Sequence, residues 1–364
     1  MDYKYVVAGA GLAGLTVAER IANELDERVL VIEKRSHIGG NVYDSYNEEG
    51  ILIHNYGPHI FHTNDGEVYR YLSRFTPWND FWHRVLTYVD GNLIPMPITV
   101  ETVNKLYNLN LSCDEVEAFL KSRSEVIPEI KTSRDVALSK VGKDLYEKIF
   151  ENYTRKQWGI DPAELDTSVI SRIPIRLNRD TRYFNDRYQG MPKYGYTKLC
   201  EKMIANKNIK ILLNTDYKEV IDRIQYKKLI YTGPADYFYN YKHGRLAYRS
   251  IDFVFETYRR EEYQAAPVVN YPNDYDFTRI TEFKKLTGQE HRMTTILKEY
   301  PTAEGEPYYP FPTREYKEQF ALYKKEMEKE KNVIFLGRLA EYRYYNMDAA
   351  VRRALDIFKG ELNG

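Results

Sequence analysis

A glycine-rich turn near the N-terminus constrains the fold of this chain more than any other feature. The turn Gly9-Ala10-Gly11-Leu12-Ala13-Gly14 follows an apolar segment at 3–8 and precedes an Ala- and Leu-bearing stretch at 12–25. A strand, a tight turn and a helix are therefore expected in that order. A β-branched run at 28–33 then resembles a buried parallel strand and ends at Glu33. Together these segments predict a βαβ unit that opens a Rossmann-like sheet.

The same residues predict a dinucleotide site. Gly9 permits the tight turn, Gly11 lets a pyrophosphate approach the backbone, and Gly14 lets the helix pack closely on the sheet. The N-terminus of that helix offers free N–H groups and the positive end of its dipole. Glu33 lies 19 residues beyond Gly14, where a carboxylate can accept a hydrogen bond from an adenosine ribose. We therefore expect Gly9, Gly11, Gly14 and Glu33 to bind a dinucleotide.

A second glycine motif favours FAD over NAD as that dinucleotide. Glu33-Lys34-Arg35 is followed by Gly39-Gly40-Asn41, which resembles the second motif of FAD-binding oxidases and related flavoproteins. A glycine loop of this kind can run close to the pyrophosphate and ribityl chain because it lacks side chains. Lys34, Gly39, Gly40 and Asn41 are accordingly predicted to contact FAD.

Composition excludes several other classes of protein. Lys plus Arg equals Asp plus Glu at 53 each, so no global field attracts nucleic acid, and no nucleic-acid partner is expected. Only Cys113 and Cys200 are present, which argues against a disulfide framework and fits a reducing cytoplasm. No apolar stretch approaches the roughly 20 residues that span a bilayer, and no leader-like segment precedes the first strand. A cytoplasmic protein without membrane insertion is expected.

Hydrophobic patterning predicts an α/β fold: a Rossmann-like FAD-binding domain with an inserted helical bundle and an antiparallel β-sheet domain. Helix-period patterns dominate 99–158, most clearly at 112–122 and 140–152, whereas polar loop sequence is expected from Gly39 to Asn64. Alternating segments at 250–257, 265–270 and 292–297 predict the antiparallel sheet. The segments 209–213 and 228–231 are predicted to return to the dinucleotide-binding sheet.

The C-terminus is predicted to return to the nucleotide site as well. An exposed helix at 315–331, a strand at 332–336, Gly337-Arg338 and a last helix at 348–359 follow one another. The domains are therefore expected to be discontinuous. The predicted boundaries are 1–76, 189–240 and 312–364 for the FAD-binding domain, 77–98 and 241–311 for the sheet domain, and 99–188 for a helical substrate domain with a mobile lid.

A family resemblance rests on motifs distributed over nearly the whole chain. The segment Tyr56-Gly57-Pro58-His59-Ile60-Phe61-His62-Thr63-Asn64 resembles the signature of UDP-galactopyranose mutases of the bacterial type. Further matches follow in the same order as in that family, at 153–159, 171–176, 183–190, 195–199, 231–234, 306–310 and 337–342.

The resemblance implies an isomerase that interconverts UDP-galactopyranose and UDP-galactofuranose for cell-surface polysaccharides. Members use reduced FAD, whose N5 acts as nucleophile on the anomeric carbon of galactose, and the reaction has no net redox change. NAD(P)H or another reductant is expected to reduce the flavin, and a homodimer is expected because members are commonly dimeric.

The resemblance also implies the site residues. Arg172, in the lid, and Arg279 match the arginines that hold the diphosphate, to which planar guanidinium groups are well suited. His62 matches a histidine near the flavin and the sugar, and these three are the predicted catalytic residues. Further matches place His59, Gly337, Arg338, Asn346 and Met347 at the cofactor. The predicted substrate contacts, besides both arginines, are His83, Phe150, Tyr153, Trp158, Tyr183, Phe184, Asn270, Tyr309 and Tyr344.

Two positions depart from the family pattern. The segment Tyr344-Tyr345-Asn346-Met347 has an amide where family members carry an aspartate, and Asp348 is not an obvious substitute. His83 stands where some members have an asparagine near the substrate. Both departures bear on how substrate is bound, and neither removes the flavin motifs or the two arginines.

Several alternative functions stay open from sequence alone. An FAD-dependent oxidoreductase of the amine-oxidase type would explain the flavin motifs but not the paired arginines. A mutase acting on UDP-N-acetylgalactosamine would need room at C2 of the sugar, and His59 favours plain galactose. A non-catalytic nucleotide-sugar sensor is the third alternative. His54, His59 and His62 could suggest a metal, but no cysteine or carboxylate completes a set, so no metal site is expected.

Overall fold

A five-stranded parallel sheet organises the Rossmann-like part of the chain, as seen in a computed structural model that describes residues 2–363. Its order is β10-β2-β1-β11-β17. The strands come from three separate stretches of sequence, so the returns predicted at 209–213, 228–231 and 332–336 are confirmed. The strands are β1 (Asp2–Ala8), β2 (Val29–Ile32), β10 (Ile209–Leu212), β11 (Gln225–Tyr231) and β17 (Val333–Phe335).

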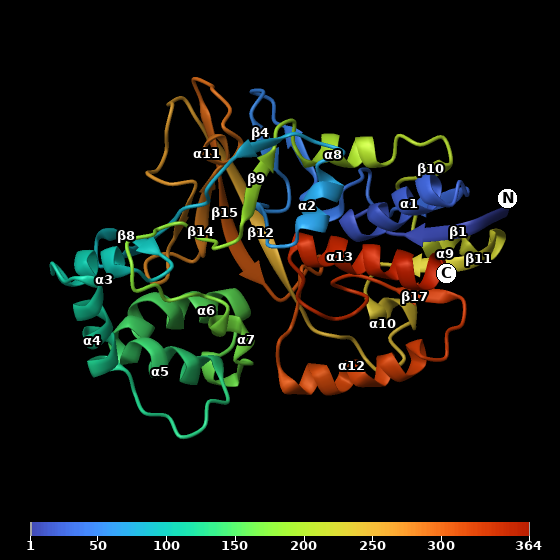
Figure 1. Cartoon of the computed structure of the whole chain (residues 1–364). Helices are drawn as coiled ribbons and strands as arrows, with labels where there is room; N and C mark the ends of the chain where they lie inside the picture. The colour runs from blue at the N-terminus through green and yellow to red at the C-terminus, as the bar shows by residue number, and fades with distance from the viewer. Residues whose placement is uncertain (1, 364) are drawn as a thin grey trace.

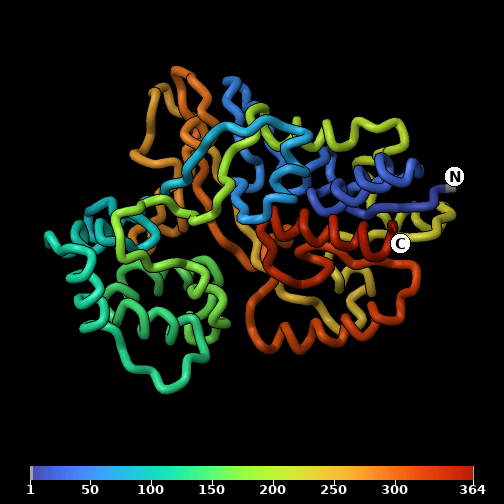
Figure 2. Tube along the Cα trace, viewed as in Figure 1, coloured from blue at the N-terminus to red at the C-terminus, as the bar shows by residue number. Residues whose placement is uncertain are grey.

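Helices cover this sheet because alternate strand residues point to opposite faces. Val7 joins the core beneath α1 (Leu12–Glu24) and α13 (Met347–Ile357), whereas Val6 and Ala8 pack toward α9 (Tyr217–Val220) and α10 (Ala235–Phe238). The first strand and the last helix therefore belong to the same unit, and the blue and red ends of the chain lie together at the right in both views (Figure 1, Figure 2).

Gly14 allows α1 to approach the sheet. A Cβ atom at this position would lie 2.1 Å from the carbonyl oxygen of Gly9. No rotation of a side chain can relieve a contact with backbone, so only glycine fits here. The role predicted for Gly14 from sequence, close helix–sheet packing, is confirmed.

A second, seven-stranded sheet has the order β16-β12-β15-β14-β13-β7-β8. Its pairs are antiparallel except one, because β13 runs parallel to β7 and joins the strand hairpin that precedes the helical insertion. The prediction of an antiparallel sheet is therefore correct except at this junction. The strands are β7 (Val85–Val89), β8 (Asn92–Met96), β12 (Tyr248–Tyr258), β13 (Val268–Asn270), β14 (Arg279–Glu282), β15 (Thr294–Thr302) and β16 (Tyr309–Pro310).

The inserted helices form a separate cluster, at the lower left in Figure 1. The first three begin with capping boxes, in which Thr99, Ser112 and Thr132 each accept a hydrogen bond from the third helical N–H. The helices are α3 (Val100–Tyr107), α4 (Cys113–Arg123), α5 (Ser133–Leu145), α6 (Asn152–Trp158) and α7 (Ser168–Ser171).

The helical pattern predicted at 140–152 is confirmed, but the helical path is broken at Gly142. Gly142 adopts a φ of 75°, which breaks the helical path, and a π-helical turn at Tyr146–Glu151 then leads into α6. A Cβ atom on Gly142 would lie 2.0 Å from the carbonyl oxygen of Arg123 on α4. The break therefore reflects a backbone contact between two helices that periodicity along one segment does not reveal.

The loop expected from Gly39 to Asn64 is also partly wrong, because three short strands lie within it. β3 (Asp44–Tyr46) pairs with β4 (Leu52–His54), and β5 (Phe61–Thr63) pairs with β9 (Tyr188–Pro192), which in turn pairs with β6 (Trp78–Asp80). Strands this short show no alternation of polar and apolar residues, so the sequence did not reveal them.

The remaining helices are α2 (Gly66–Leu72), α8 (Tyr196–Met203), α11 (Phe283–Thr287) and α12 (Arg314–Met327), with short 3₁₀ or π turns at Gly40–Val42, Pro162–Glu164, Ile221–Arg223 and Phe358–Leu362.

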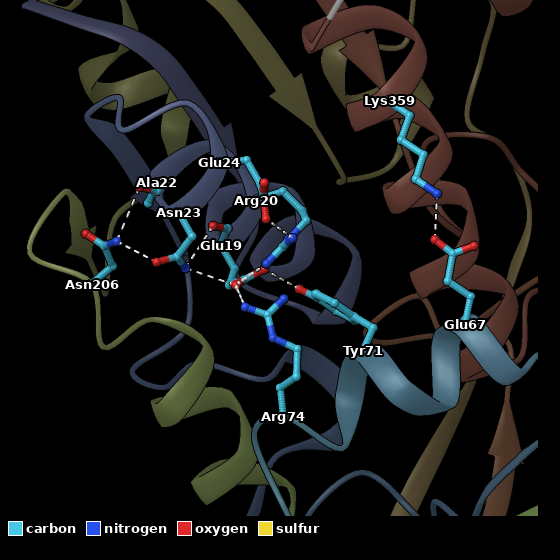
Figure 3. A network of polar contacts seen from close by, with 10 residues as sticks. All are labelled: Glu19, Arg20, Ala22, Asn23, Glu24, Glu67, Tyr71, Arg74, Asn206 and Lys359. Carbon is cyan, nitrogen blue, oxygen red and sulfur yellow. Dashed lines mark hydrogen bonds and ion pairs between the residues drawn. The ribbon is translucent and has the colours of Figure 1, made fainter.

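A buried carboxylate joins α1 to α2 (Figure 3). Glu19 is fully buried, and its oxygens accept from Arg20 at 2.5 and 2.6 Å and from the Tyr71 hydroxyl at 2.8 Å. Lys359, beyond α13, donates to Glu67 on α2 at 2.5 Å. Because a buried charge is tolerated only when it is paired and hydrogen-bonded, this network fixes how the helices over the nucleotide site pack.

Within residues 2–363, no helix combines the length and apolar character that crossing a bilayer would require.

Candidate active site

A cavity of about 810 Å³ lies at the carboxyl ends of β1, β2 and β11. This is the edge at which open α/β sheets bind nucleotides, and the volume is within the range of roughly 300–1,000 Å³ typical of cofactor sites. Every residue predicted to contact the cofactor lines this one cavity: Gly9, Gly11, Gly14, Glu33, Lys34, Gly39, Gly40, Asn41, His59, Gly337, Arg338, Asn346 and Met347.

The N-terminus of α1 faces this cavity with no side-chain cap. A Cβ atom at Gly11 would meet only the Cα of Gly40, at 3.9 Å, so the space beside Gly11 is open. Gly11 is thus not needed for packing, in contrast to Gly14. Uncapped N–H groups, a helix dipole and open space beside the backbone are what a pyrophosphate requires.

Glu33 has a structural role in addition to the ribose contact predicted from its distance to the glycine turn in the sequence. Its carboxylate is 6% exposed, and its two oxygens accept from the backbone N–H groups of Ala10 at 2.8 Å and Arg35 at 2.9 Å. Glu33 therefore holds the glycine turn against the end of β2. Each oxygen retains a further lone pair, so the carboxylate can also accept from a ribose hydroxyl.

Glu306 is a cavity residue that sequence reasoning missed. Lys34 donates to both of its oxygens at 2.9 Å, and Arg35 lies 3.3 Å from one of them. These contacts connect the end of β2 to the loop before β16, and all three residues line the cavity. Lys34 is consequently neutralised in part before any phosphate reaches it.

The N-terminus of α13 forms another wall. Arg338 donates to the carbonyl oxygens of Tyr308 at 3.1 Å and Tyr345 at 2.6 Å, and Asn346 caps α13 without a side-chain hydrogen bond. Asp348 accepts from the Thr63 hydroxyl at 2.9 Å. That carboxylate is engaged elsewhere and does not replace the acidic group that Asn346 lacks.

Buried His54 pairs with His59, which is partly exposed and lines the cavity. The backbone N–H of His59 donates to Nδ1 of His54 at 3.1 Å, and Nδ1 of His59 lies 2.9 Å from the Gly57 carbonyl oxygen. Burial, followed by repulsion from His54, lowers the pKa of His59 to about 3, and burial lowers the pKa of His54 to about 4. Both rings are neutral at pH 7. Among residues 2–363, no three His, Cys, Asp or Glu side chains gather as a metal site would require.

Next to this cavity lies a group of residues that we call the arginine–tyrosine cluster: Arg172, Arg338, Tyr309 and Tyr344. The Arg172 guanidinium lies 4.9 Å from the Tyr344 ring centroid, and Arg338 lies 5.2 Å from both tyrosine rings. The two rings stack at 5.8 Å. The cluster brings together residues from the segment predicted to form the lid, from β16 and from the region before α13.

Tyr344 reports the electrostatics of the cluster. The Tyr344 side chain is 43% exposed, so it is desolvated only in part. That desolvation raises the pKa of its hydroxyl, but the positive charges of Arg172, Arg338 and Arg279 outweigh it, and the pKa lies below its ordinary value of 10.0. Three guanidinium groups thus act on one hydroxyl. An excess of positive charge of this kind, presented by planar groups, suits a diphosphate.

Arg279 and Asn270 are placed by the second sheet. They stand opposite each other on β14 and β13, and Glu299 stands opposite Arg279 on β15. Arg279 Nε donates to Glu299 Oε1 at 2.7 Å, and the glutamate is fully buried. Sequence reasoning missed Glu299, whose sole signal is a carboxylate within an apolar strand.

The predicted catalytic residue His62 lies together with three of the predicted substrate contacts. The His62 ring stacks on Phe184 at 3.6 Å, and His83 stacks on Phe184 at 5.8 Å and meets Tyr183 edge-on at 5.6 Å. The backbone N–H of Tyr183 donates to the His83 carbonyl oxygen at 2.7 Å. Burial, with Arg279 and His62 adding repulsion, lowers the pKa of His83 to about 3, so this ring is neutral at pH 7.

The helical insertion contributes aromatic residues with different exposures. Tyr153 on α6 is partly exposed, and burial raises its pKa to about 12. Trp158 is 5% exposed, and its ring centroid lies 6.5 Å from that of Tyr309, so Trp158 packs against the buried side of the arginine–tyrosine cluster. Phe150 is likewise 5% exposed and packs with Trp158 in the core of the helical insertion, so its contact with substrate stays a prediction.

Comparison with known proteins agrees with this arrangement. Residues 148–344 match the family model for UDP-galactopyranose mutase, and residues 7–75 match an NAD(P)-binding Rossmann-like domain. A probable UDP-galactopyranose mutase from Klebsiella pneumoniae is 40% identical over 96% of this chain and 92% of its own length. A dTDP-fucopyranose mutase from Escherichia coli is 34% identical over 97% of each chain.

The fold also matches a solved structure. A crystal structure of reduced UDP-galactopyranose mutase superimposes with a TM-score of 0.78 over 100% of this chain and 96% of that one, at 16% identity. Because the family model covers more than half of the chain and the sequence relatives cover nearly all of it, membership does not depend on the fold alone. The chain belongs to the UDP-galactopyranose mutase family of isomerases.

Proposed function

We propose that this protein interconverts UDP-galactopyranose and UDP-galactofuranose with reduced FAD as cofactor. The observation that carries the proposal is the arginine–tyrosine cluster beside the dinucleotide cavity, in which Arg172 and Arg338 lie 4.9 and 5.2 Å from the Tyr344 ring. The charge of Arg279 also acts on the Tyr344 hydroxyl. The cavity suits the dinucleotide cofactor, and the neighbouring cationic cluster suits the diphosphate of a second ligand. Two such sites side by side support a flavin enzyme whose substrate is a nucleotide sugar.

The cavity suits FAD in its chemistry. Gly11 and the N-terminus of α1 would hold the pyrophosphate, Glu33 the adenosine ribose, and the residues around Arg338, Asn346 and Met347 the far end. When bound and reduced by NAD(P)H or another reductant, FAD supplies a nucleophilic N5 for the anomeric carbon of the sugar.

Arg172 and Arg279 would stabilise the departing UDP. As the bond between sugar and phosphate breaks, negative charge accumulates on the diphosphate, and two guanidinium groups within a dry site stabilise that charge strongly. The hydroxyls of Tyr309 and Tyr344 would donate to the same oxygens. Since UDP must recombine with the rearranged sugar, tight retention of UDP is part of the reaction.

The segment 172–187 would act as the lid that retains UDP. Arg172 begins this segment, and its far end carries Tyr183 and Phe184 against His83. The buried Arg176 guanidinium donates to the carbonyl oxygens of Asp180 and Tyr183 at 3.2 Å each, which gives the segment an internal brace. A braced segment can move as one piece, and its closure over the substrate would exclude water.

The deciding experiment is a turnover assay with the flavin in each redox state. Purified protein should be yellow, and dithionite should start the conversion of UDP-galactofuranose to UDP-galactopyranose, measured by chromatography, whereas the oxidised enzyme should be inactive. Absence of conversion with fully reduced flavin would refute the proposal. Oxidation of an amine with release of peroxide would favour the amine-oxidase alternative instead.

The same assay separates nucleotide sugars within the family. UDP-N-acetylgalactosamine tests room at C2, and dTDP-fucofuranose tests the base and the sugar C6, because a relative of that name is 34% identical. We expect the highest kcat/KM with UDP-galactofuranose. If the enzyme prefers either of the other two substrates, the proposed mutase reaction still holds, but the sugar assigned to it is wrong.

A further inference from the structure

We propose that Asp186 is a positioning residue that determines which ring nitrogen of His62 carries the proton. The inference rests on the proposed function, because His62 matters for catalysis only as the histidine beside the flavin and the sugar. Asp186 lies within the matched segment 183–190, but the resemblance assigns it no role, and it lies 124 residues away from its partner in the chain.

The geometry is a short chain of hydrogen bonds. Asp186 Oδ2 lies 3.0 Å from His62 Nδ1, and Asp186 Oδ1 accepts from Asn64 Nδ2 at 3.0 Å. Asn64 Oδ1 in turn accepts from the backbone N–H of Arg187 at 2.9 Å. Each side chain is therefore oriented by the next, and the last link is to backbone, which cannot rotate away.

The local fold keeps these groups in register. His62 is on β5 and pairs with Gln189 on β9, just after Asp186 in the chain. The Gln189 side chain donates to the carbonyl oxygens of Phe184 at 3.2 Å and Asp186 at 2.9 Å. Phe184 stacks on the His62 ring at 3.6 Å with an interplanar angle of 12°, which fixes the ring plane.

The chemistry follows from what each group can donate. An ionised carboxylate only accepts hydrogen bonds, so Nδ1 of His62 must carry the proton. In the neutral ring Nε2 then has a free lone pair. Within residues 2–363 Nε2 has no hydrogen-bond partner, and the side chain is 14% exposed. Nε2 is thus left to accept from a ligand hydroxyl, such as those of a sugar.

Asn64 makes the substitution Asp186→Asn informative. The amide of Asn64 is oriented by Arg187, so its NH₂ group continues to face residue 186. The new amide must present its oxygen to Asn64, because two NH₂ groups would otherwise meet. Its own NH₂ group then faces His62 Nδ1, which has to become an acceptor, and the proton moves to Nε2.

The test combines nitrogen NMR of the histidine rings with kinetics. In the wild-type protein we expect His62, assigned by its loss in H62Q, to carry its proton on Nδ1, and in D186N on Nε2. We expect kcat of D186N to fall roughly tenfold or more with a smaller change in KM, since a positioned acceptor matters most in the transition state. The NMR measurement of the His62 tautomer does not require turnover, so it tests the role of Asp186 even if the proposed function is wrong.

A second substitution should reverse the first. In D186N/N64D, the new carboxylate at position 64 can accept both from the Arg187 backbone N–H and from the new amide at position 186. The oxygen of that amide then faces His62, so the proton should return to Nδ1 and much of kcat should return with it.

A matched control lies in the same segment. Asp180 pairs with Arg182 rather than with His62, so His62 in D180N should keep the tautomer of the wild-type protein. An unchanged tautomer in D186N, or the same change of tautomer in D180N, would overturn the proposal.

Discussion

Arg279 and Glu299 stand opposite each other on β14 and β15, and the guanidinium Nε donates to a carboxylate oxygen at 2.7 Å. Glu299 is fully buried, and its other oxygen, Oε2, has no hydrogen-bond partner among residues 2–363. The pair anchors the arginine through Nε alone. The two terminal nitrogens of the planar group are left to bind an anion in the bidentate manner that suits a diphosphate.

Removing Arg279 should therefore damage both stability and catalysis. In Arg279→Ala the buried Glu299 carboxylate is left unpaired, which typically costs about 3–5 kcal/mol. Loss of a charge-assisted diphosphate contact should lower kcat/KM at least about a hundredfold. Urea unfolding and the conversion of UDP-galactofuranose measure the two effects separately.

A double variant distinguishes the two roles. In R279A/E299Q the unpaired charge is gone, so we expect most of the lost stability to return while kcat/KM stays as low as in R279A. Recovery of turnover together with stability would mean that Arg279 acts through folding alone, and that the diphosphate binds elsewhere.

The glycines of the first turn allow a matched comparison of binding with packing. A Cβ atom at Gly11 enters open space in the cavity, whereas one at Gly14 would lie 2.1 Å from the Gly9 carbonyl oxygen. Gly11→Ala should leave the melting temperature of the protein freed of flavin nearly unchanged, and should lower the flavin content of the purified protein. Gly14→Ala should lower the melting temperature severely or prevent soluble expression. Equal flavin retention in the two variants would contradict these roles.

Local patterns allowed the dinucleotide fold to be predicted. The turn, α1 and β2 lie within 33 residues, and their periodicity and glycines are visible without knowledge of the rest. Features that depend on contacts between distant segments were missed. Gly142 breaks its helix because α4 lies against it, and β13 pairs with β7 in parallel although the whole helical insertion and β9 to β12 separate them in the chain. Strands of three residues, such as β5, carry no usable period.

The residues of the candidate site also divide into those that local motifs predict and those that only contacts between distant segments reveal. Every cofactor residue proposed from motifs lines one cavity, because those motifs lie at strand ends that the parallel sheet gathers. Phe150 could not be separated from a core residue, since a buried aromatic and a ligand-contacting one look alike in a helix. Glu299 and Asp186 were missed because a carboxylate shows its role only when its partner, Arg279 or His62, is seen beside it.

Tyr344 should ionise at a lower pH than the other tyrosines of the protein. The charges of Arg172, Arg338 and Arg279 outweigh burial and place its pKa below 10.0. The difference in tyrosinate absorbance between the wild-type protein and Tyr344→Phe should show this transition as pH rises. UDP should move the transition to higher pH, because a bound diphosphate neutralises the three arginines. If adding UDP does not change the pH of this transition, the nucleotide binds away from the cluster.

The stability of the protein should fall as pH drops below about 6.5, because buried neutral histidines must take up protons on unfolding. Burial lowers the pKa of His83 to about 3, while the unfolded value is 6.5. Above pH 6.5 neither state binds this proton, and the stabilising contribution is fully present. Between the two values only the unfolded chain is protonated, so stability is lost progressively as pH falls toward 3.

The size of this effect can be isolated at one position. Between pH 7 and pH 5 a single histidine of this kind should account for roughly 2 kcal/mol of unfolding free energy. His54 and His59, with pKa values lowered to about 4 and about 3, add to the same slope in the wild-type protein. His83→Asn removes one contribution, so its stability should decline less steeply over this interval, whatever its stability at pH 7. Urea midpoints at both pH values measure the difference, and identical slopes in the two proteins would show that His83 is protonated in the folded state.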